Sequence, residues 1–183
     1  MKKFLTLKNI LICCGLVFAL VAFFLSFAAS FTVTVDHVRG QLLHIVWGCD
    51  MAIYEGHAQS TPYEVGPAVA LLLGAIFMLV GALGAAVVGL LVKKPWAKWV
   101  VVVLALLVLA GAVMQFFFIR SFANAFGKAM AKAEHMDPKT ISDQLFKEFK
   151  SGNPSAPIPV VQGILGILAG LGLGAAVLLP EKK

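Results

Sequence analysis

Three cysteines are the residues of this sequence best suited to redox chemistry, because a thiolate is both a nucleophile and a metal ligand. Cys13 and Cys14 are adjacent within a long apolar segment, and Cys49 lies in a polar segment beyond it. A disulfide requires Cα atoms within about 7 Å, and a membrane separates the pair from Cys49 in the topology derived below. We therefore expect Cys49 to be either a small buried residue beside Trp47 or half of an intermolecular bridge.

The polar segment around Cys49 also contains side chains that can bind a metal ion. They are Asp36, His37, His44, Asp50, Glu55 and His57. Their spacing matches no compact metal motif, and seven residues along a strand place His37 and His44 on opposite faces. We predict a polar, solvated loop surface there and no metal site.

The remaining sequence shows no Gly-rich phosphate loop, no HExxH pair and no Ser nucleophile elbow. Gln115 and Gln162 are the main polar side chains within apolar segments, and we interpret both as helix-to-helix hydrogen-bonding groups. Proton-coupled transporters usually rely on an ionisable residue inside a span, and the interiors of these apolar segments contain no acidic or basic residue. We therefore predict no catalytic residue, no cofactor and a non-enzymatic protein.

Four apolar segments must position these residues. The chain has 183 residues, of which 60% are hydrophobic and 13% charged, with a mean hydropathy of +0.92, well beyond soluble domains. A helix of about 20 apolar residues can cross a bilayer. We predict a single domain, 1–183, in the lipid bilayer, with four membrane-spanning helices. Their predicted positions are 9–29, 67–92, 97–119 and 158–179.

Lysines indicate the orientation of these spans. The lysines close to span ends are Lys2, Lys3, Lys8, Lys93, Lys94, Lys98, Lys182 and Lys183. Positive charge accumulates in short cytoplasmic loops, so we predict a cell-membrane protein with both termini and the 93–98 turn in the cytoplasm. The outer loops are then 30–66 and 120–157. Because the basic residues flank spans, the net charge of +6 does not indicate a nucleic-acid partner.

The first span has a second interpretation. Lys2, Lys3, an apolar core and Ser26-Phe27-Ala28 resemble a secretory signal peptide with a small-residue cleavage site. The apolar core at 10–27 is longer than the usual ~7–15 residues, so we favour a retained span. Cleavage would leave three spans and the same sidedness of the loops.

The first outer loop has the pattern of a small β-structure. Alternating residues at 31–36 predict a strand, Gly40 a turn, and Leu43, Ile45 and Trp47 one face of a second strand. A third strand is expected at 51–54, and 56–67 is turn-rich. We expect this structure to pack on the second loop or on the outer ends of the spans.

The second outer loop has a helical pattern. Apolar residues recur every four positions across 122–130, and the third span could continue outward through them. Asp137-Pro138 is typical of an N-cap followed by proline at the first helical position. The predicted fold class is an all-α membrane protein, a four-transmembrane-helix bundle with a β-type first outer loop and a helical second one.

Small residues at intervals of four predict where spans pack. They are Gly81, Ala85 and Gly89 in the second span, and Gly166, Gly170 and Gly174 in the fourth. Such residues let helix backbones approach closely in lipid. We expect contacts within the bundle, with a homo-oligomer interface as the alternative.

Large apolar residues make the second outer loop the best candidate partner surface. They are Phe122, Phe126, Ile141, Leu145, Phe146 and Phe149. Burying each of these side chains stabilises the fold by about 1.5–3 kcal/mol, so we expect them to be shielded from water. They form either a closed cap with the first loop or a docking surface for a membrane protein or the lipid interface.

Two transmembrane hairpins, a β-type first loop, a helical second loop and Trp47-Gly48-Cys49 resemble the claudin-like tetraspan layout. Claudins carry a Gly-Leu-Trp triplet followed by two disulfide-bonded cysteines. Here the Trp and one Cys are present, whereas the triplet and the second Cys are missing. Ile45-Val46-Trp47-Gly48 also resembles the Ile-Phe-Gly-like motif that often ends the outer loop of small four-helix membrane proteins of bacteria. These resemblances imply an architecture and no activity.

We therefore predict a non-enzymatic scaffold or accessory subunit of the cell envelope, bound to a membrane-protein partner or to further copies of itself. The alternative is a small oligomeric transporter or channel component.

Overall fold

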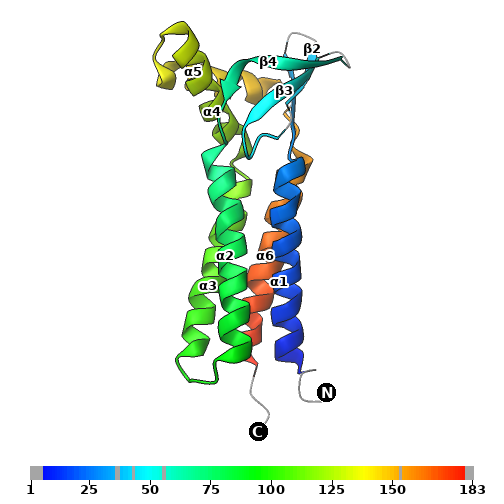
Figure 1. The fold of residues 1–183 in the computed structure, drawn as a ribbon, viewed down its shortest axis with the longest axis vertical. Helices are drawn as coiled ribbons and strands as arrows, with labels where there is room; N and C mark the ends of the chain where they lie inside the picture. The colour runs from blue at the N-terminus through cyan, green and yellow to red at the C-terminus, as the bar shows by residue number, and fades with distance from the viewer. Residues whose placement is uncertain (1–5, 36–37, 43, 55–56, 153, 180–183) are drawn as a thin grey trace. The chain divides into compact units, whose positions relative to one another are not determined.

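The computed structural model describes residues 6–35, 38–42, 44–54, 57–152 and 154–179, and only the backbone of 33–35, 38–42, 49–54 and 57–63. Several residues considered above lie outside this part of the chain, namely Lys2, Lys3, Asp36, His37, Leu43, Glu55, Lys182 and Lys183. The described residues form six α-helices, one short 3-10 helix and four strands (Figure 1).

Four helices are long and apolar enough to cross a bilayer. They are α1 (Leu7–Leu25), α2 (Val69–Leu91), α3 (Ala97–Gln115) and α6 (Pro157–Leu178). The 3-10 helix η1 (Ser26–Ala28) follows α1 directly. With a rise of 1.5 Å per residue, α3 extends roughly 28 Å, close to the hydrocarbon thickness of a bilayer. The four predicted spans are therefore confirmed as helices of a multi-pass membrane protein.

The chain divides into two compact units. The helical unit comprises Met1–Phe24, Leu73–Met114 and Val161–Lys183, and the sheet unit comprises Leu25–Leu72 and Gln115–Val160. Each unit has its own cluster of buried apolar residues. Both predicted outer loops fall within the sheet unit, in line with the expectation that the first loop packs on the second.

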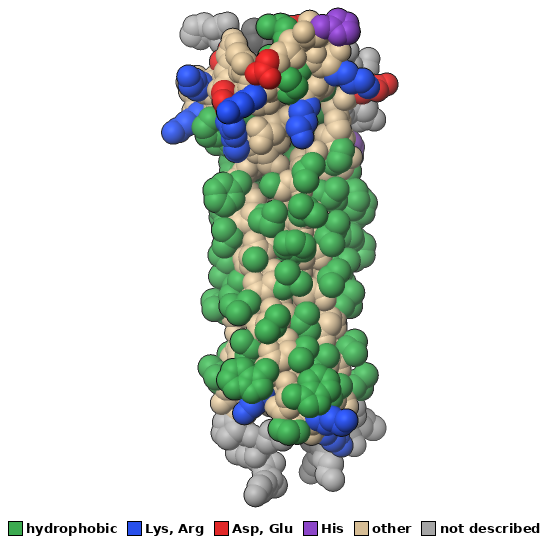
Figure 2. Space-filling model, turned by 90° about the vertical axis from the view of Figure 1, so that its left-hand side faces the viewer, with side chains coloured by type: hydrophobic (Ala, Val, Ile, Leu, Met, Phe, Trp, Pro, Cys, Tyr) green, Lys and Arg blue, Asp and Glu red, His purple; other side chains and the backbone are tan. Residues whose placement is uncertain are grey.

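The helical unit has small side chains inside and large ones outside. Its buried core contains Ala19, Ala22, Ala82, Ala85, Ala86, Ala105, Ala112, Ala169 and Ala176 beside a few larger residues. Exposed residues on the same helices include Val17, Phe18, Val80, Val103, Leu106 and Leu171. Figure 2 shows hydrophobic side chains spread over one face of these helices. A surface of this kind requires lipid as its solvent, because water would not tolerate so much continuous apolar area.

The sheet unit contains an antiparallel sheet with the strand order β1-β2-β3-β4 (Figure 1). Its strands are β1 (Phe31–Val35), β2 (Val38–Leu42), β3 (Cys49–Tyr54) and β4 (His57–Val65). The outer edge of β1 exchanges two backbone hydrogen bonds of 2.8 Å with Ser155. Thr32 and Ser155 thereby join the two predicted outer loops through main-chain bonds.

Three predictions for the first loop were wrong in detail. Gly40 does not turn the chain but lies within β2, opposite Val33 and Tyr54. Ile45 and Trp47 lie in a turn and not on a strand, with His44 in the left-handed region (φ 56°). The segment predicted to be turn-rich contains β4, whose pairing with β3 is irregular between Cys49 and Met51. Pro62 lies within β4, and a proline is tolerated where the ladder is interrupted.

The second loop forms α4 (Phe118–Glu134) and α5 (Pro138–Ser151). Phe116 and Phe117 form a turn, so α3 does not run continuously into α4. His135 ends α4 in the left-handed conformation (φ 55°), and its N–H donates to Ala131 O. Asp137 then caps α5, as the Asp-Pro pair predicts.

Candidate functional site

Four of the six predicted packing residues lie where helices of the helical unit approach closely. A Cβ added to Gly81 would lie 2.8 Å from Leu104 O, and one added to Gly89 would lie 2.9 Å from Ile12 Cδ1. At Gly166 a Cβ would collide with Met78 and Ala112, and at Gly170 it would lie 2.6 Å from Leu109 Cγ. Ala85 is also fully buried.

Gly174 differs from the prediction, because a Cβ there would meet nothing within 4 Å. Two further glycines that the spacing did not reveal make close contacts. A Cβ on Gly15 would lie 2.9 Å from Leu173 Cγ, and one on Gly111 would lie 2.5 Å from Gly74 O. Gly111 has no small residue at an interval of four and Gly15 has only Ala19, so neither belongs to a run of three such as those in the second and fourth spans.

The candidate partner surface of the second loop is largely buried in the sheet unit. Phe122, Ile141, Leu145 and Phe149 are buried, and Phe126 and Phe146 are partly buried. Phe31 of β1 lies among them, with ring centroids 4.9 Å from Phe122 and 5.3 Å from Phe149. The docking interpretation therefore fails for the four buried residues, because their apolar faces already pack within the chain. Their arrangement matches the closed-cap alternative.

Close helix approach also occurs in the sheet unit, at Gly127 of α4. A Cβ there would collide with the Ser142 hydroxyl and lie 2.9 Å from the Ser142 Cα. Both residues are buried. Glycine at 127 and serine at 142 therefore set the separation of α4 and α5 at their crossing.

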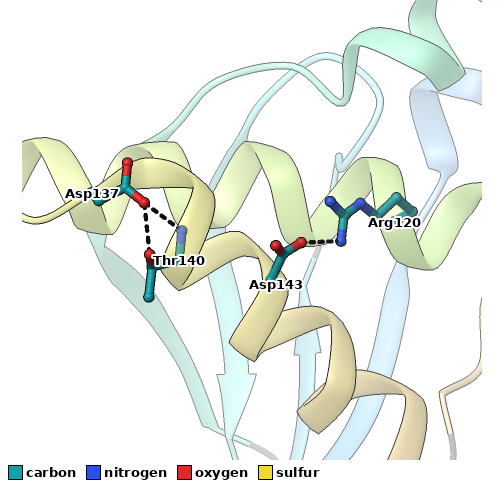
Figure 3. A network of polar contacts seen from close by, with 4 residues as sticks. All are labelled: Arg120, Asp137, Thr140 and Asp143. Carbon is teal, nitrogen blue, oxygen red and sulfur yellow. Dashed lines mark hydrogen bonds and ion pairs between the residues drawn. The ribbon is translucent and has the colours of Figure 1, made fainter.

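Two groups of polar contacts lie at the surface of α4 and α5, one between the helices and one at the start of α5 (Figure 3). Arg120 Nη1 forms an ion pair of 2.6 Å with Asp143 Oδ1, and its guanidinium lies 5.2 Å from the ring centroid of Phe146. Asp137 Oδ2 accepts hydrogen bonds from the Thr140 hydroxyl at 2.7 Å and the Thr140 N–H at 2.8 Å. These bonds, the hydroxyl first, lower the pKa of the Asp137 carboxyl below its ordinary value of 3.8.

Two glutamines provide the buried amides anticipated from the sequence. In the sheet unit, Gln115 Nε2 donates to Leu71 O at 3.0 Å, and in the helical unit, Gln162 Nε2 donates to Ala22 O at 2.7 Å. Each bond joins two helices, as expected. Both Oε1 atoms are buried without a hydrogen-bond donor within the described part of the chain.

The residues suited to redox or metal chemistry do not assemble into a site among the described residues. Cys13 and Cys14 are free thiols exposed on α1. Cys49 begins β3, but its side chain lies outside the described atoms, so both interpretations of it stay open. Among the described residues, no three metal-binding side chains lie close enough together to hold an ion. His44 instead makes a 2.9 Å bond through Nδ1 to Phe27 O.

Trp47 and Phe27 form an aromatic pair at the surface of the sheet unit. Their rings stack with centroids 4.9 Å apart, and Trp47 Nε1 donates to Ser26 Oγ at 3.0 Å. Gly48 follows with φ +132°, a conformation that a residue with a Cβ rarely adopts. Trp47 and Gly48 thus act together in a turn. The glycine allows the positive φ of the backbone, and the Trp47 indole bonds back to Ser26 at the end of the first span.

The described residues of the helical unit line two hollows of note. One is an apolar groove of about 310 Å³ between α3 and α6, lined by Ala105, Leu106, Gly170, Gly174 and Ala175 among others. The other has a volume of about 370 Å³, and four lysines line it: Lys8, Lys93, Lys94 and Lys98. Of these two hollows, the basic pocket combines charged side chains with an apolar wall.

No protein-family model matches the sequence, and a search of curated proteins finds no significant match. A function must therefore be inferred from the geometry of the two units.

Proposed function

We propose that this protein is a non-enzymatic scaffold or accessory subunit of a membrane complex, anchored by a four-helix bundle and presenting the sheet unit outside the cell membrane. The observation that carries this proposal is the folded sheet unit itself. About half of the chain lies in it, with a closed core of its own. A membrane anchor alone does not require such a unit, whereas binding to a partner requires a stable surface.

The packing of the helical unit supports binding over transport. Its interior is occupied by helix contacts, such as those at Gly81 and Gly111, where backbone carbonyls lie within about 3 Å of an added Cβ. α1 contributes Ile12, Gly15 and Ala19 to this interior, which favours a first span that is retained. An oligomeric transporter or channel, the alternative, would need a path between copies of the chain.

The exposed face of α4 and α5 is the best candidate for the binding surface. Its exposed lysines are Lys128, Lys132, Lys139, Lys147 and Lys150. Acidic side chains accompany them, including the ion-paired Asp143. Figure 2 shows basic and acidic side chains together on part of the face that it draws. A mixed charged surface of this kind suits a protein partner, because complementary charges fix orientation and register.

Site-specific photocrosslinking in intact cells tests this proposal. A photoreactive amino acid at Lys147 or Lys132 should capture one defined protein, because both positions are exposed on the sheet unit. Leu106 and Leu171, exposed on the helical unit, serve as controls that should capture lipid or further copies of the chain. Absence of a protein crosslink from every exposed position on α4 and α5 would contradict the proposal. Solute flux through proteoliposomes of the purified protein would favour the transporter alternative.

The proposed orientation is tested with a membrane-impermeant thiol reagent. The experiment uses a variant with the three native cysteines replaced by serine, carrying either Lys147→Cys or Lys94→Cys. On intact cells the cysteine at 147 should react and the one at 94 should not, because the positive-inside rule predicts a cytoplasmic 93–98 turn. The reverse pattern would invert the topology.

The claudin-like layout remains our proposal for the architecture. Support comes from the four strands within 31–65 and from the helices of the second loop. The Trp47-Gly48 pair, which carries the resemblance, forms a turn that binds back to Ser26.

A further inference from the structure

We propose that the basic pocket of the helical unit binds the phosphate headgroup of an anionic phospholipid of the cytoplasmic leaflet. The pocket is lined by the start of α1, the turn between α2 and α3, and the end of α6. This inference goes beyond the scaffold function and shares with it the placement of the four helices in a bilayer and the proposed cytoplasmic position of the 93–98 turn.

The polar part of the pocket is strongly positive. Lys93, Lys94 and Lys98 line it together with Lys8, and no described residue that lines it is acidic. α3 begins at Ala97, also a lining residue, and a helix N-terminus adds partial positive charge. Basic pockets between transmembrane helices on the cytoplasmic side suit anionic headgroups.

The turn that carries these lysines is short and held in place. It connects Leu91 to Ala97, contains Pro95, and is closed by a 3.0 Å hydrogen bond from Ala97 N to Lys94 O. Lys98 lies in the first turn of α3, with Nζ 5.5 Å from the centroid of Trp99. The backbone that carries the lysines is therefore ordered before a ligand binds, which reduces the entropy lost on binding.

The apolar part of the pocket distinguishes a lipid from a soluble anion. Ile12, Val92, Val101 and Val177 line it, and they offer contact to glycerol and the first methylenes of an acyl chain. The volume of about 370 Å³ lies near the lower end of ligand pockets, enough for a headgroup but not for a whole lipid. Trp96 and Trp99 are exposed beside the same turn, and tryptophan is enriched at the level of lipid headgroups.

The test uses the full-length protein in a mild nonionic detergent. Bound lipid is counted by native mass spectrometry, and the melting temperature is measured with added dioleoyl phosphatidylglycerol, dioleoyl phosphatidylcholine or inorganic phosphate. The wild type should retain and be stabilised by phosphatidylglycerol far more than by phosphatidylcholine. The triple variant Lys93→Gln, Lys94→Gln, Lys98→Gln should lose at least about tenfold in affinity for phosphatidylglycerol. Its melting temperature without lipid shows whether it is folded.

Two matched variants distinguish specific binding in the pocket from non-specific attraction of the anionic lipid to positive charge. Lys128→Gln, Lys132→Gln, Lys147→Gln removes the same charge from the sheet unit and should leave phosphatidylglycerol binding unchanged. Val177→Trp should abolish phosphatidylglycerol binding, because the larger side chain fills the pocket from its apolar wall without changing the charge. If the Val177→Trp variant does not fold, Val92→Phe is used in its place.

Four outcomes would overturn the proposal. They are equal binding of both lipids, equal losses in the two lysine variants, full binding by the filled pocket, or complete competition by inorganic phosphate at the same concentration. Failure here would leave the crosslinking result for α4 and α5 untouched, so the two proposals are tested separately.

Discussion

The core of the helical unit contains mostly small side chains, whereas the core of the sheet unit contains several large aromatic ones. The helical unit buries mostly alanines around glycines, with Met78 and Leu173 among the few large residues. The sheet unit buries phenylalanines, with Phe31, Phe122 and Phe149 in mutual ring contact. Outside, the two units differ in polarity: valine and leucine cover the long helices, whereas lysines are exposed on α4 and α5.

This difference reflects the solvent that each unit faces. In water, burying a large apolar side chain is favourable in proportion to the area removed, so a small unit gains most from phenylalanine. In lipid that gain disappears, and helices associate through close packing and hydrogen bonds, so alanine and glycine serve better. The residues that stabilise one unit would therefore weaken the other.

The largest expected effect is the removal of an aromatic ring from the sheet unit. Phe122→Ala should lower the free energy of unfolding by about 3–5 kcal/mol, because Phe122 is fully buried among other rings. Phe117→Ala is the control, since Phe117 is 59% exposed. Hydrogen exchange of α4 and α5, measured in detergent, reports the difference. Equal effects of both substitutions would mean that the ring cluster is not the core.

A smaller effect is expected when a side chain is added to the helical unit. Gly170→Leu should destabilise by about 1–3 kcal/mol, because a Cβ at 170 would already lie 2.6 Å from Leu109 Cγ. Gly174→Leu, one turn further along the same helix, makes the same chemical change in open space and should be tolerated. Melting in detergent compares the two variants. If the apolar groove, which both glycines line, is a contact between copies of the chain, Gly174→Leu should reduce oligomerisation as well.

The Asp137 cap of α5 should contribute less to the stability of the fold than these packing contacts, and only when the Asp137 carboxyl is ionised. The pKa of Asp137 is lowered in the folded state, so its stabilisation is complete above the ordinary value of 3.8 and is lost as the pH falls through the folded value. Asp137→Ala should therefore reduce stability at pH 7 and make little difference well below pH 3.8. Helicity measured by circular dichroism against pH checks this, with Thr140→Val as the variant that removes only the hydroxyl donor. A difference independent of pH would exclude the carboxylate as the cause.

The smallest expected effect is loss of the surface ion pair in the sheet unit. Arg120 and Asp143 are 42% and 45% exposed, so solvent and salt screen their attraction. A double-mutant cycle with Arg120→Gln and Asp143→Asn should give a coupling of roughly 0.2–1 kcal/mol. The coupling should decrease as sodium chloride is raised. A coupling that salt does not change would indicate that the contact of Arg120 with the Phe146 ring dominates instead.

The sequence was informative where one local rule decides the structure. The four spans follow from length and apolar content, and each predicted helix lies within a few residues of the observed one. The start of α5 follows from Asp137-Pro138 because capping involves only neighbouring residues. β1 follows from strict alternation at 31–36, of which 31–35 form the strand.

The sequence was less informative where distant residues decide. β4 contains Pro62 and few apolar residues, and it forms a strand because β3 provides a partner. Ile45 and Trp47 alternate like a strand, but His44 and Gly48 turn the chain around them. The basic pocket was visible only as lysines near span ends, because its wall comes from α1, α3 and α6, which are remote in sequence.

The contact between β1 and the second loop has a consequence for the order of events during synthesis. Thr32 bonds to Ser155, and Phe31 packs on Phe149, so residues more than a hundred positions apart complete one core. At about 5–20 residues per second, β1 is made on the order of ten seconds before its partners. We expect the nascent first loop to wait on the outer side with Phe31 uncovered, where a chaperone that recognises apolar strands would have time to bind it. Folding of the sheet unit is complete only once the segment leading into the last span has been translated.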